Sequence, residues 1–200
     1  MPRTIAIIVG AGRGHRFGGG VPKQYLDLCG RPVLGHTLRA FAEHRRVDAI
    51  LPVIHPDDAE LFRTAALGIE TLAPVFGGAQ RQDSVLNGLR AIAGMAPDYV
   101  LVHDAARPRV AADLIDRVLD ALANADGAVP ALPVTDTLKR TDAAGRIADT
   151  VSRDGLWRAQ TPQGFRFRSL LDAHEAVAGR ALTDDAAVAE AWGLMVGVVP

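Results

Sequence analysis

The stretch that most constrains the fold is residues 4–24, TIAIIVGAGRGHRFGGGVPKQ, where an apolar run breaks abruptly into a glycine-rich loop. Residues 5–9 are apolar and mostly β-branched, which predicts a buried strand. The loop that follows holds six glycines and three cations, Arg13, Arg16 and Lys23. Glycines let backbone amides approach a ligand closely, and the cations add positive charge, so we predict an anion site here.

Two standard phosphate loops do not fit this stretch. The dinucleotide pattern G-x-G-x-x-G would need a third glycine where His15 or Phe17 stands. A P-loop needs Ser or Thr after its lysine, whereas Gln24 follows Lys23. The composition still favours a polyphosphate ligand, and a glycine-rich turn with solvated basic residues is the alternative. An NAD-dependent dehydrogenase is the least favoured function, because its fingerprint fails.

Composition excludes several classes of protein. The length of 200 residues predicts a single domain, and the net charge of −1 does not suggest a nucleic-acid partner. Cys29 is the only cysteine, which rules out an internal disulfide and fits a reducing compartment; we expect it in a turn or a small buried site. No stretch reaches the roughly 18 apolar residues of a membrane span, and the N-terminal apolar run is too short for a signal peptide. We therefore expect a soluble, cytoplasmic protein that binds no membrane.

Apolar runs alternate with helical patterns along most of the chain. We expect helices over residues 33–44, from Asp57 or Asp58 as cap to about 66, after 84, over 111–124, 167–177 and 184–192. We expect strands over residues 48–55 (weakened by Pro52), 70–75, 99–102, 127–134 and 194–199, the last one buried. This order predicts an α/β fold with one mainly parallel sheet flanked by helices.

A second loop, GGAQRQDS at residues 77–84, leads directly into a helical pattern. Helix N-termini carry free amides and partial positive charge, so this is a second candidate anion site. The alternative is an ordinary helix start in which Asp83 or Ser84 accepts those amide hydrogens, and the stretch taken alone favours it.

The apolar run at 99–102 ends in HDAARP. In an open α/β sheet, ligands bind beyond the carboxyl ends of the strands, which places Asp104 and Arg107 beside the first loop. A carboxylate beside bound phosphates is typical of a Mg²⁺ site. A surface ion pair at a turn is the alternative.

Residues 135–161 break the pattern, because they are polar and lack a helical apolar face. Two short runs, DTLKRT and RIADTV, flank a turn at 142–145, which predicts a hairpin. Such a hairpin buries too little apolar surface to be stable alone, so we expect it to pack against a twin subunit. Arg153 and Trp157 lie just beyond it and could reach a neighbouring site. We expect one domain over 1–200, with a dimerising arm at about 135–160.

Eight motifs now point to a family. They are GAGRGHRF with PKQYL, GGAQRQDSV, VLVHDAARP, PVTDTLKR, VSRDGLW, RAQTPQGF and LTDDAAVAEAWG. In this order, from about residue 5 to 199, the chain resembles 2-C-methyl-D-erythritol 4-phosphate cytidylyltransferases. The resemblance implies a nucleotidyltransferase-like, Rossmann-like fold with a protruding β-arm and a homodimer joined through that arm. It also implies transfer of CMP from CTP to methylerythritol phosphate with Mg²⁺, in the non-mevalonate isoprenoid pathway.

The resemblance also implies a role for each matching position. The catalytic cations would be Arg16 and Lys23, and the metal ligand would be Asp104. The nucleotide would contact Gly10, Ala11, Gly12, Arg13, Gly14, Gly78, Asp83, Ser84 and Ala105. Methylerythritol phosphate would contact Arg107, Thr137, Arg153, Thr161 and Thr183, with Arg153 supplied by the partner chain. Thr183 is also the expected N-cap of the helix over 184–192.

The chain departs from the family in two places. Its loop reads Val9-Gly10-Ala11-Gly12 where the family usually has Pro-Ala-Ala-Gly, a change that loosens the amide cradle. The family also continues into a segment Asn-x-Lys-x-Thr that this sequence does not reach, so we expect a cropped chain, as from a fusion with a downstream 2-C-methyl-D-erythritol 2,4-cyclodiphosphate synthase domain, or a missing catalytic contact. Two alternatives are a cytidylyltransferase for another polyol phosphate, such as ribitol 5-phosphate, and a non-catalytic nucleotide-binding scaffold.

Overall fold

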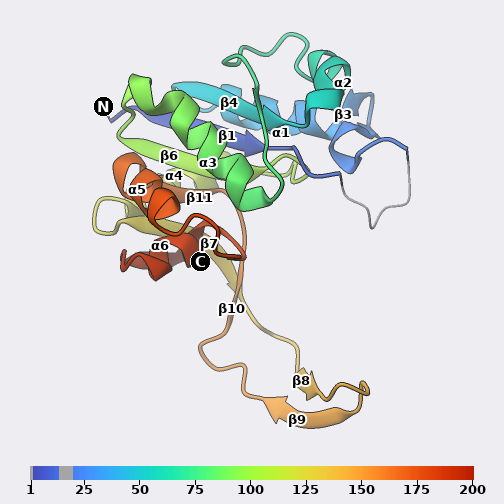
Figure 1. The fold of residues 1–200 in the computed structure, drawn as a ribbon, viewed down its shortest axis with the longest axis vertical. Coiled ribbons are helices and arrows are strands. Elements are labelled where there is room, and N and C mark those ends of the chain that lie inside the picture. The colour runs from blue at the N-terminus through green and yellow to red at the C-terminus, as the bar shows by residue number, and fades with distance from the viewer. Residues whose placement is uncertain (1, 14–19) are drawn as a thin grey trace.

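The computed structural model describes residues 2–13 and 20–200, which form a sheet covered by helices and a hairpin that extends away from it (Figure 1). The strands of the sheet lie in the order β10-β7-β11-β6-β1-β4-β5, and β12 also pairs with β7. Their bounds are β1 Thr4–Val9, β4 Ala49–Ile54, β5 Val75–Phe76, β6 Tyr99–Asp104, β7 Gly127–Pro133, β10 Trp157–Ala159, β11 Gln163–Arg166 and β12 Val196–Val199.

The centre of the sheet is parallel. β1 pairs in parallel with both β4 and β6, β4 pairs in parallel with β5, and β12 pairs in parallel with β7. Within the described part of this sheet, only the pairs that involve β10 or β11 are antiparallel. The predicted α/β fold with a mainly parallel sheet is therefore confirmed.

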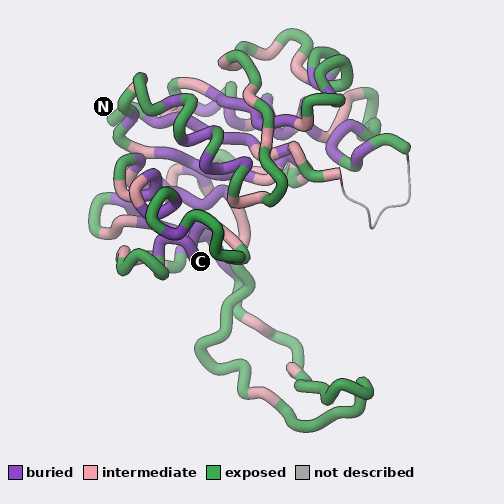
Figure 2. Tube along the Cα trace, viewed as in Figure 1, coloured by how far each residue is buried: buried purple, intermediate pink, exposed green. Residues whose placement is uncertain are grey.

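Side chains of β1 alternate between two apolar cores, as expected of a strand buried on both faces. Ala6 and Ile8 pack on one side with helix α1, Val33–Ala42, and helix α4, Ala112–Ala121. Ile5 and Ile7 pack on the other side with helix α3, Arg81–Ile92, and helix α5, Phe167–Ala176. The buried trace in Figure 2 runs through these central strands and the inner faces of the helices. Helix α2, Ala59–Ala65, and helix α6, Asp185–Ala191, complete the layers.

Several element predictions need correction. Asp58 occupies the N-cap position of α2, as one of the two predicted caps, but its side chain makes no capping hydrogen bond. A 3-10 turn, Pro56–Asp58, precedes the helix, and the His55 side chain accepts the Asp57 amide hydrogen. The apolar run at 70–75 yields only the two residues of β5. β12 is half-exposed rather than buried, because it lies at the edge of the sheet beside β7.

The N-cap of α6 is Asp184, whose side chain accepts the Ala187 amide hydrogen, and not Thr183. Pro52 has no amide hydrogen, and its nitrogen faces the β5 side of β4, the side to which the Ile50 and Ile54 carbonyls also point. On that side β5 pairs only with the last two residues of β4, so Pro52 is tolerated there. The missing amide hydrogen therefore breaks no ladder between β1 and β4.

Short elements near the first loop surround Cys29. A 3-10 turn at Lys23–Tyr25 is followed by the paired strands β2, Asp27–Leu28, and β3, Arg31–Pro32. Cys29 lies in the turn between them with a φ of 53° and is exposed, so it is a turn residue as expected. A further 3-10 turn, Ala93–Met95, follows α3. None of the helices in the described ranges has the length and apolar character needed to cross a membrane.

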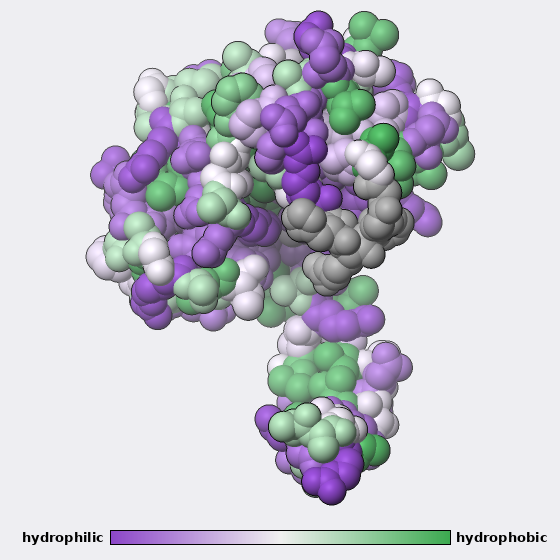
Figure 3. Space-filling model, turned by 45° about the vertical axis from the view of Figure 1, so that its right-hand side comes forward, coloured by the Kyte–Doolittle hydropathy of each residue, from purple (hydrophilic) through white to green (hydrophobic). Residues whose placement is uncertain are grey.

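The predicted hairpin is present and stands apart from the sheet. Its strands β8, Leu138–Thr141, and β9, Ile147–Val151, pair with each other as a separate two-stranded sheet. The turn is closed by Asp142, which accepts the backbone amide hydrogens of Ala144 and Arg146, and by Gly145 at a φ of 79°. Figure 2 shows this arm exposed along nearly its whole length, and Figure 3 shows apolar surface on it beside polar surface.

Candidate functional site

A cavity of about 790 Å³ opens at the carboxyl ends of β1, β4 and β6, where the two glycine loops meet. Most of the residues that the resemblance assigned to nucleotide, metal and catalysis line it together: Gly10, Ala11, Gly12, Arg13, Lys23, Gly78, Ser84, Asp104 and Ala105. Arg107, assigned to the acceptor, lines it as well, whereas Asp83 does not. Gly14 and Arg16 lie outside the described residues. The two loops therefore line one cavity, at the place beyond the strand ends where a ligand crevice is expected.

The first loop is held by Gln24, a residue for which sequence reasoning found no role. Its buried side-chain amide donates to the carbonyls of Gly10 and Gly12, at 2.7 and 3.2 Å. The Gly10 amide donates to Val53 O at 2.7 Å, and a β-carbon at Gly10 would lie only 3.0 Å from that of Ala105. The loop thus lies directly against β4 and the residue that follows β6.

The guanidinium of Arg13 turns towards the start of α2. It donates to Asp58 at 3.1 Å and to Asp57 at 2.6 Å, and it lies 2.8 Å from His55 Nδ1. The Asp58 side chain thus pairs with Arg13 and makes no capping hydrogen bond to α2. The pairing also means that Arg13 brings little net positive charge to the cavity, and its contact with the nucleotide remains a prediction.

The second loop shows the local contacts of an ordinary helix start. Asp83 accepts the Gln80 amide hydrogen at 3.1 Å. The Ser84 hydroxyl accepts the Gly78 amide hydrogen at 3.1 Å and donates to the Gln80 carbonyl at 3.0 Å. These bonds shape the wall of the cavity, while the contact of this loop with the nucleotide remains a prediction.

Asp104 lies between two guanidinium groups. Arg81 Nε donates to its Oδ1 at 3.2 Å, and Arg107 Nε donates to its Oδ2 at 3.0 Å. Burial opposes the charge of Arg81, but the carboxylates of Asp185 and Asp104 outweigh it and raise the pKa of Arg81 further. Arg81 also lines the cavity, although sequence reasoning assigned it no role beyond the cation of its loop.

A lone carboxylate at this position fits Mg²⁺ only as a metal shared with a ligand. Among the described residues, no group of three or more His, Cys, Asp or Glu side chains gathers into a metal site. Mg²⁺ held by one or two carboxylates together with substrate phosphates and water needs no such group. Asp104 at the cavity wall therefore fits a metal that arrives with a polyphosphate.

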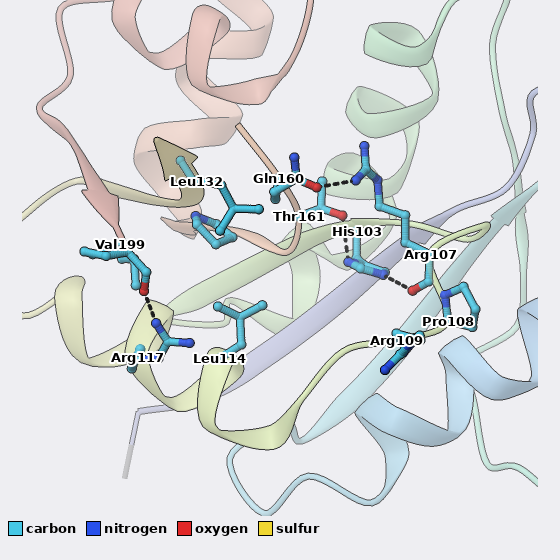
Figure 4. Close-up of a pocket in the computed structure, with 13 residues that line it drawn as sticks. His103, Arg107, Pro108, Arg109, Leu114, Arg117, Leu132, Gln160, Thr161 and Val199 are labelled. Atoms are coloured by element: carbon cyan, nitrogen blue, oxygen red, sulfur yellow. Dashed lines mark hydrogen bonds between the residues drawn. The ribbon is translucent and has the colours of Figure 1, made fainter. Parts of the chain in front are cut away.

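Figure 4 shows a smaller cavity of about 440 Å³. Arg107 lines both this cavity and the larger one. His103 is fully buried beneath the smaller cavity: its Nε2 donates to Arg107 O at 2.9 Å, and its Nδ1 lies 2.8 Å from Thr161 Oγ1. Burial lowers the pKa of His103 to about 4. The ring is therefore neutral at pH 7 with its proton on Nε2, and the Thr161 hydroxyl donates to Nδ1.

His103 makes stability depend on pH. Between its folded pKa of about 4 and its ordinary value of 6.5, the unfolded chain binds more protons than the folded chain. We expect the free energy of unfolding to fall as pH drops from 6.5 to 4, by about 3 kcal/mol from this residue. His103→Gln, which does not titrate, should flatten the dependence measured by urea unfolding at several pH values. A slope equal to that of the wild type would contradict this origin.

The other residues predicted to bind methylerythritol phosphate do not all line the two cavities of a single chain. Thr161 lines the smaller cavity beside Arg107. Thr137 and Arg153 lie on the arm, which extends away from the sheet, and Arg153 donates to the Thr135 carbonyl (Figure 1). Thr183 lies just before α6 and lines neither cavity. Thr137 and Arg153 could therefore complete a site only on another chain or after movement of the arm.

Comparison with known proteins identifies relatives over the whole chain. The family model for 2-C-methyl-D-erythritol 4-phosphate cytidylyltransferase matches residues 4–200. The bifunctional enzyme IspD/IspF of Rhodospirillum rubrum is 58% identical over 200 residues, 100% of this chain and 52% of that protein. The enzyme of the same name from Paramagnetospirillum magneticum is 55% identical over 199 residues, again covering 52% of its length. The chain thus spans about half the length of the curated relatives it matches.

Solved structures agree with this assignment. A crystal structure of a 4-diphosphocytidyl-2C-methyl-D-erythritol synthase superposes with a TM-score of 0.82 at 33% identity, covering 100% of this chain and 89% of that one. The 2-C-methyl-D-erythritol 4-phosphate cytidylyltransferase of Thermus thermophilus gives a TM-score of 0.75 at 34% identity, covering 100% and 88%. The nucleotidyltransferase-like fold is confirmed by these neighbours.

Proposed function

The chain belongs to the 2-C-methyl-D-erythritol 4-phosphate cytidylyltransferase family, and we propose that it transfers CMP from CTP to 2-C-methyl-D-erythritol 4-phosphate. The products are pyrophosphate and 4-(cytidine 5'-diphospho)-2-C-methyl-D-erythritol, an isoprenoid precursor of the non-mevalonate pathway. One observation carries the proposal: both glycine loops, Lys23 and Asp104 line a single cavity. We place the reaction in the cytoplasm, which the single exposed thiol of Cys29 fits.

The residues of the cavity suit attack by one phosphate on another. A phosphate oxygen of the acceptor attacks the α-phosphorus of CTP in line, and the bond from that phosphorus to pyrophosphate breaks. The nucleophile is already an anion, so no strong base is needed, and catalysis rests on positioning and charge neutralisation. Lys23, with Arg16 as predicted, would face the α-phosphate. The amides of Gly10 to Gly14 would hold the phosphates of CTP, and Arg107 would contact the acceptor.

We assign Mg²⁺ as the cofactor and Asp104 as its ligand from the protein. The metal would neutralise charge on the CTP phosphates and on the departing pyrophosphate. Thr161 would meet the acceptor at the smaller cavity, and because its proton is donated to His103, its lone pairs remain for a hydroxyl of the polyol. Thr137, Arg153 and Thr183 would complete the acceptor site.

We propose a homodimer in which each arm packs on the partner. Several large apolar side chains are exposed on the arm or at its base, and together they offer a surface for a partner: Leu132, Ile147, Leu156 and Trp157. Packing these side chains against a second copy would stabilise the hairpin and bring Arg153 to the partner's cavity. Sedimentation should show a dimer that Ile147→Asp shifts towards monomer, with a loss of turnover. A monomeric wild type with full activity would contradict the proposal.

The reaction is tested by pyrophosphate release from CTP with a panel of polyol phosphates. We expect Mg²⁺-dependent release with methylerythritol phosphate and little with ribitol 5-phosphate. Preference for ribitol 5-phosphate would favour the related cytidylyltransferase. Nucleotide binding without pyrophosphate release from any acceptor would favour a non-catalytic scaffold.

A further inference from the structure

Arg81 connects the interior of the protein to the wall of the larger cavity. Its Nη1 donates to Asp185 Oδ2 at 2.8 Å, and its Nε donates to Asp104 Oδ1 at 3.2 Å. The Asp185 side chain is 1% exposed, whereas that of Asp104 is 33% exposed. One guanidinium therefore spans from a buried carboxylate to a carboxylate that faces ligand.

The inner end of this connection is fixed from two sides. Asp185 begins α6, and its Oδ1 accepts a hydrogen bond from Nε2 of the fully buried His174 of α5, at 3.0 Å. Burial favours the neutral acid, but the hydrogen bond from His174 and the charge of Arg81 together lower the pKa of Asp185. A buried carboxylate held on both oxygens by charge-assisted hydrogen bonds gives Arg81 a rigid anchor.

Arg107 binds the other oxygen of Asp104 without such an anchor. Its Nε donates to Asp104 at 3.0 Å and its Nη1 donates to Gln160 at 2.6 Å, and the side chain is 47% exposed. Exposed ion pairs of this kind contribute little to stability. Arg107 can therefore leave Asp104 for a ligand phosphate at small cost, whereas Arg81 cannot.

We propose that Arg81 is the positioning residue of this site, which keeps the Asp104 carboxylate in one orientation when Arg107 turns to a ligand phosphate. The inference rests on the proposed function, because the cation at Asp104 would be the Mg²⁺ of CTP and the phosphate that Arg107 would contact is that of the acceptor. Arg81 occupies one lone-pair direction of Asp104 Oδ1 and leaves the others for a cation. It acts on the cation through Asp104, as partners of metal-binding carboxylates commonly do.

The experiment compares CTP binding with and without Mg²⁺ by calorimetry. Loss of a partner of a metal ligand typically weakens metal affinity by about 10- to 100-fold. We expect Arg81→Gln to weaken CTP binding at least about tenfold with Mg²⁺ and less than about threefold with EDTA. Arg81→Lys keeps a positive charge but cannot bind Asp104 and Asp185 with one planar group, so its affinity for CTP with Mg²⁺ should lie between those of Arg81→Gln and the wild type. The control Arg90→Gln removes an exposed arginine of the same helix, paired with Glu175 at 3.3 Å, and should match the wild type.

Thermal unfolding and circular dichroism would show that each variant is folded, and Arg81→Lys carries the comparison if Arg81→Gln does not fold. Equal weakening with and without Mg²⁺ would overturn the positioning role, since it would indicate direct phosphate binding or a general structural role. An unchanged affinity with Mg²⁺ would also overturn it. Failure of the wild type to bind CTP in either condition would instead count against the proposed function.

Discussion

Replacing Lys23 with alanine is expected to lower turnover by about 10²- to 10³-fold, the cost typical of losing one preorganised group that stabilises a transition-state charge. The reason is local. Lys23 is an exposed cation at the mouth of the cavity, in a 3-10 turn that the buried side chains of Gln24 and Tyr25 hold in place. Because this turn is already in place, the protein needs little reorganisation for Lys23 to neutralise the negative charge that accumulates on the phosphates. Steady-state pyrophosphate release at saturating CTP and acceptor measures the effect.

The same variant should keep its stability, because Lys23 is an exposed residue. We expect its thermal midpoint to stay close to that of the wild type. Arg168→Ala is the matched control, since it also removes one cation, but from an exposed i,i+4 pair with Asp172 on α5. Near-normal turnover in the folded Lys23→Ala variant would exclude a catalytic role for Lys23, independently of the predicted role of Arg16.

The fold could largely be predicted because local patterns set its elements. The apolar runs of β1, β4, β6 and β7 are each buried on at least one face, and periodicity located α1, α3, α4 and α5. The predictions of elements failed where a local sequence pattern suits more than one structure and tertiary packing decides between them. Residues 70–75 are apolar enough for a strand, yet only Val75 and Phe76 pair with β4. Thr183 and Asp184 both suit an N-cap, and only the structure distinguishes them.

The loops of the candidate site could be predicted from the sequence, but the hydrogen bonds and ion pairs between its side chains could not. Strand order places the two glycine loops and HDAARP at one edge of the sheet, which follows from the α/β pattern. The partners of Arg13 and Arg81 could not be predicted, because Asp58 and Asp185 lie 45 and 104 residues away in sequence. Arginine and aspartate are common throughout the chain, and nothing local says which pairs form. Gln24 was missed for the same reason, since an amide that supports a loop has no motif.

A methyl group at Gly77 should damage the site more than its size suggests. Gly77 joins the two loops: a β-carbon there would overlap that of Ala11 in the first loop and lie 2.6 Å from Ser84 Oγ in the second. The Ala11 β-carbon has no rotamer to change, and turning the Ser84 hydroxyl away would break its hydrogen bonds to Gly78 and Gln80. We expect Gly77→Ala to lower the free energy of unfolding by about 1–3 kcal/mol, as overpacking usually does.

The loops can relieve this overlap only by moving apart, so Gly77→Ala should also weaken CTP binding at least about tenfold, which is about 1.4 kcal/mol. Urea unfolding and calorimetry with CTP measure the two effects. Gly94→Ala is the matched control: it adds the same methyl group where no atom lies within 4 Å, and should leave both quantities near the wild type. Because Gly77 does not adopt a positive φ, backbone strain cannot account for a loss. A Gly77→Ala variant with normal stability and CTP affinity would mean that the contact between the loops does not shape the nucleotide site.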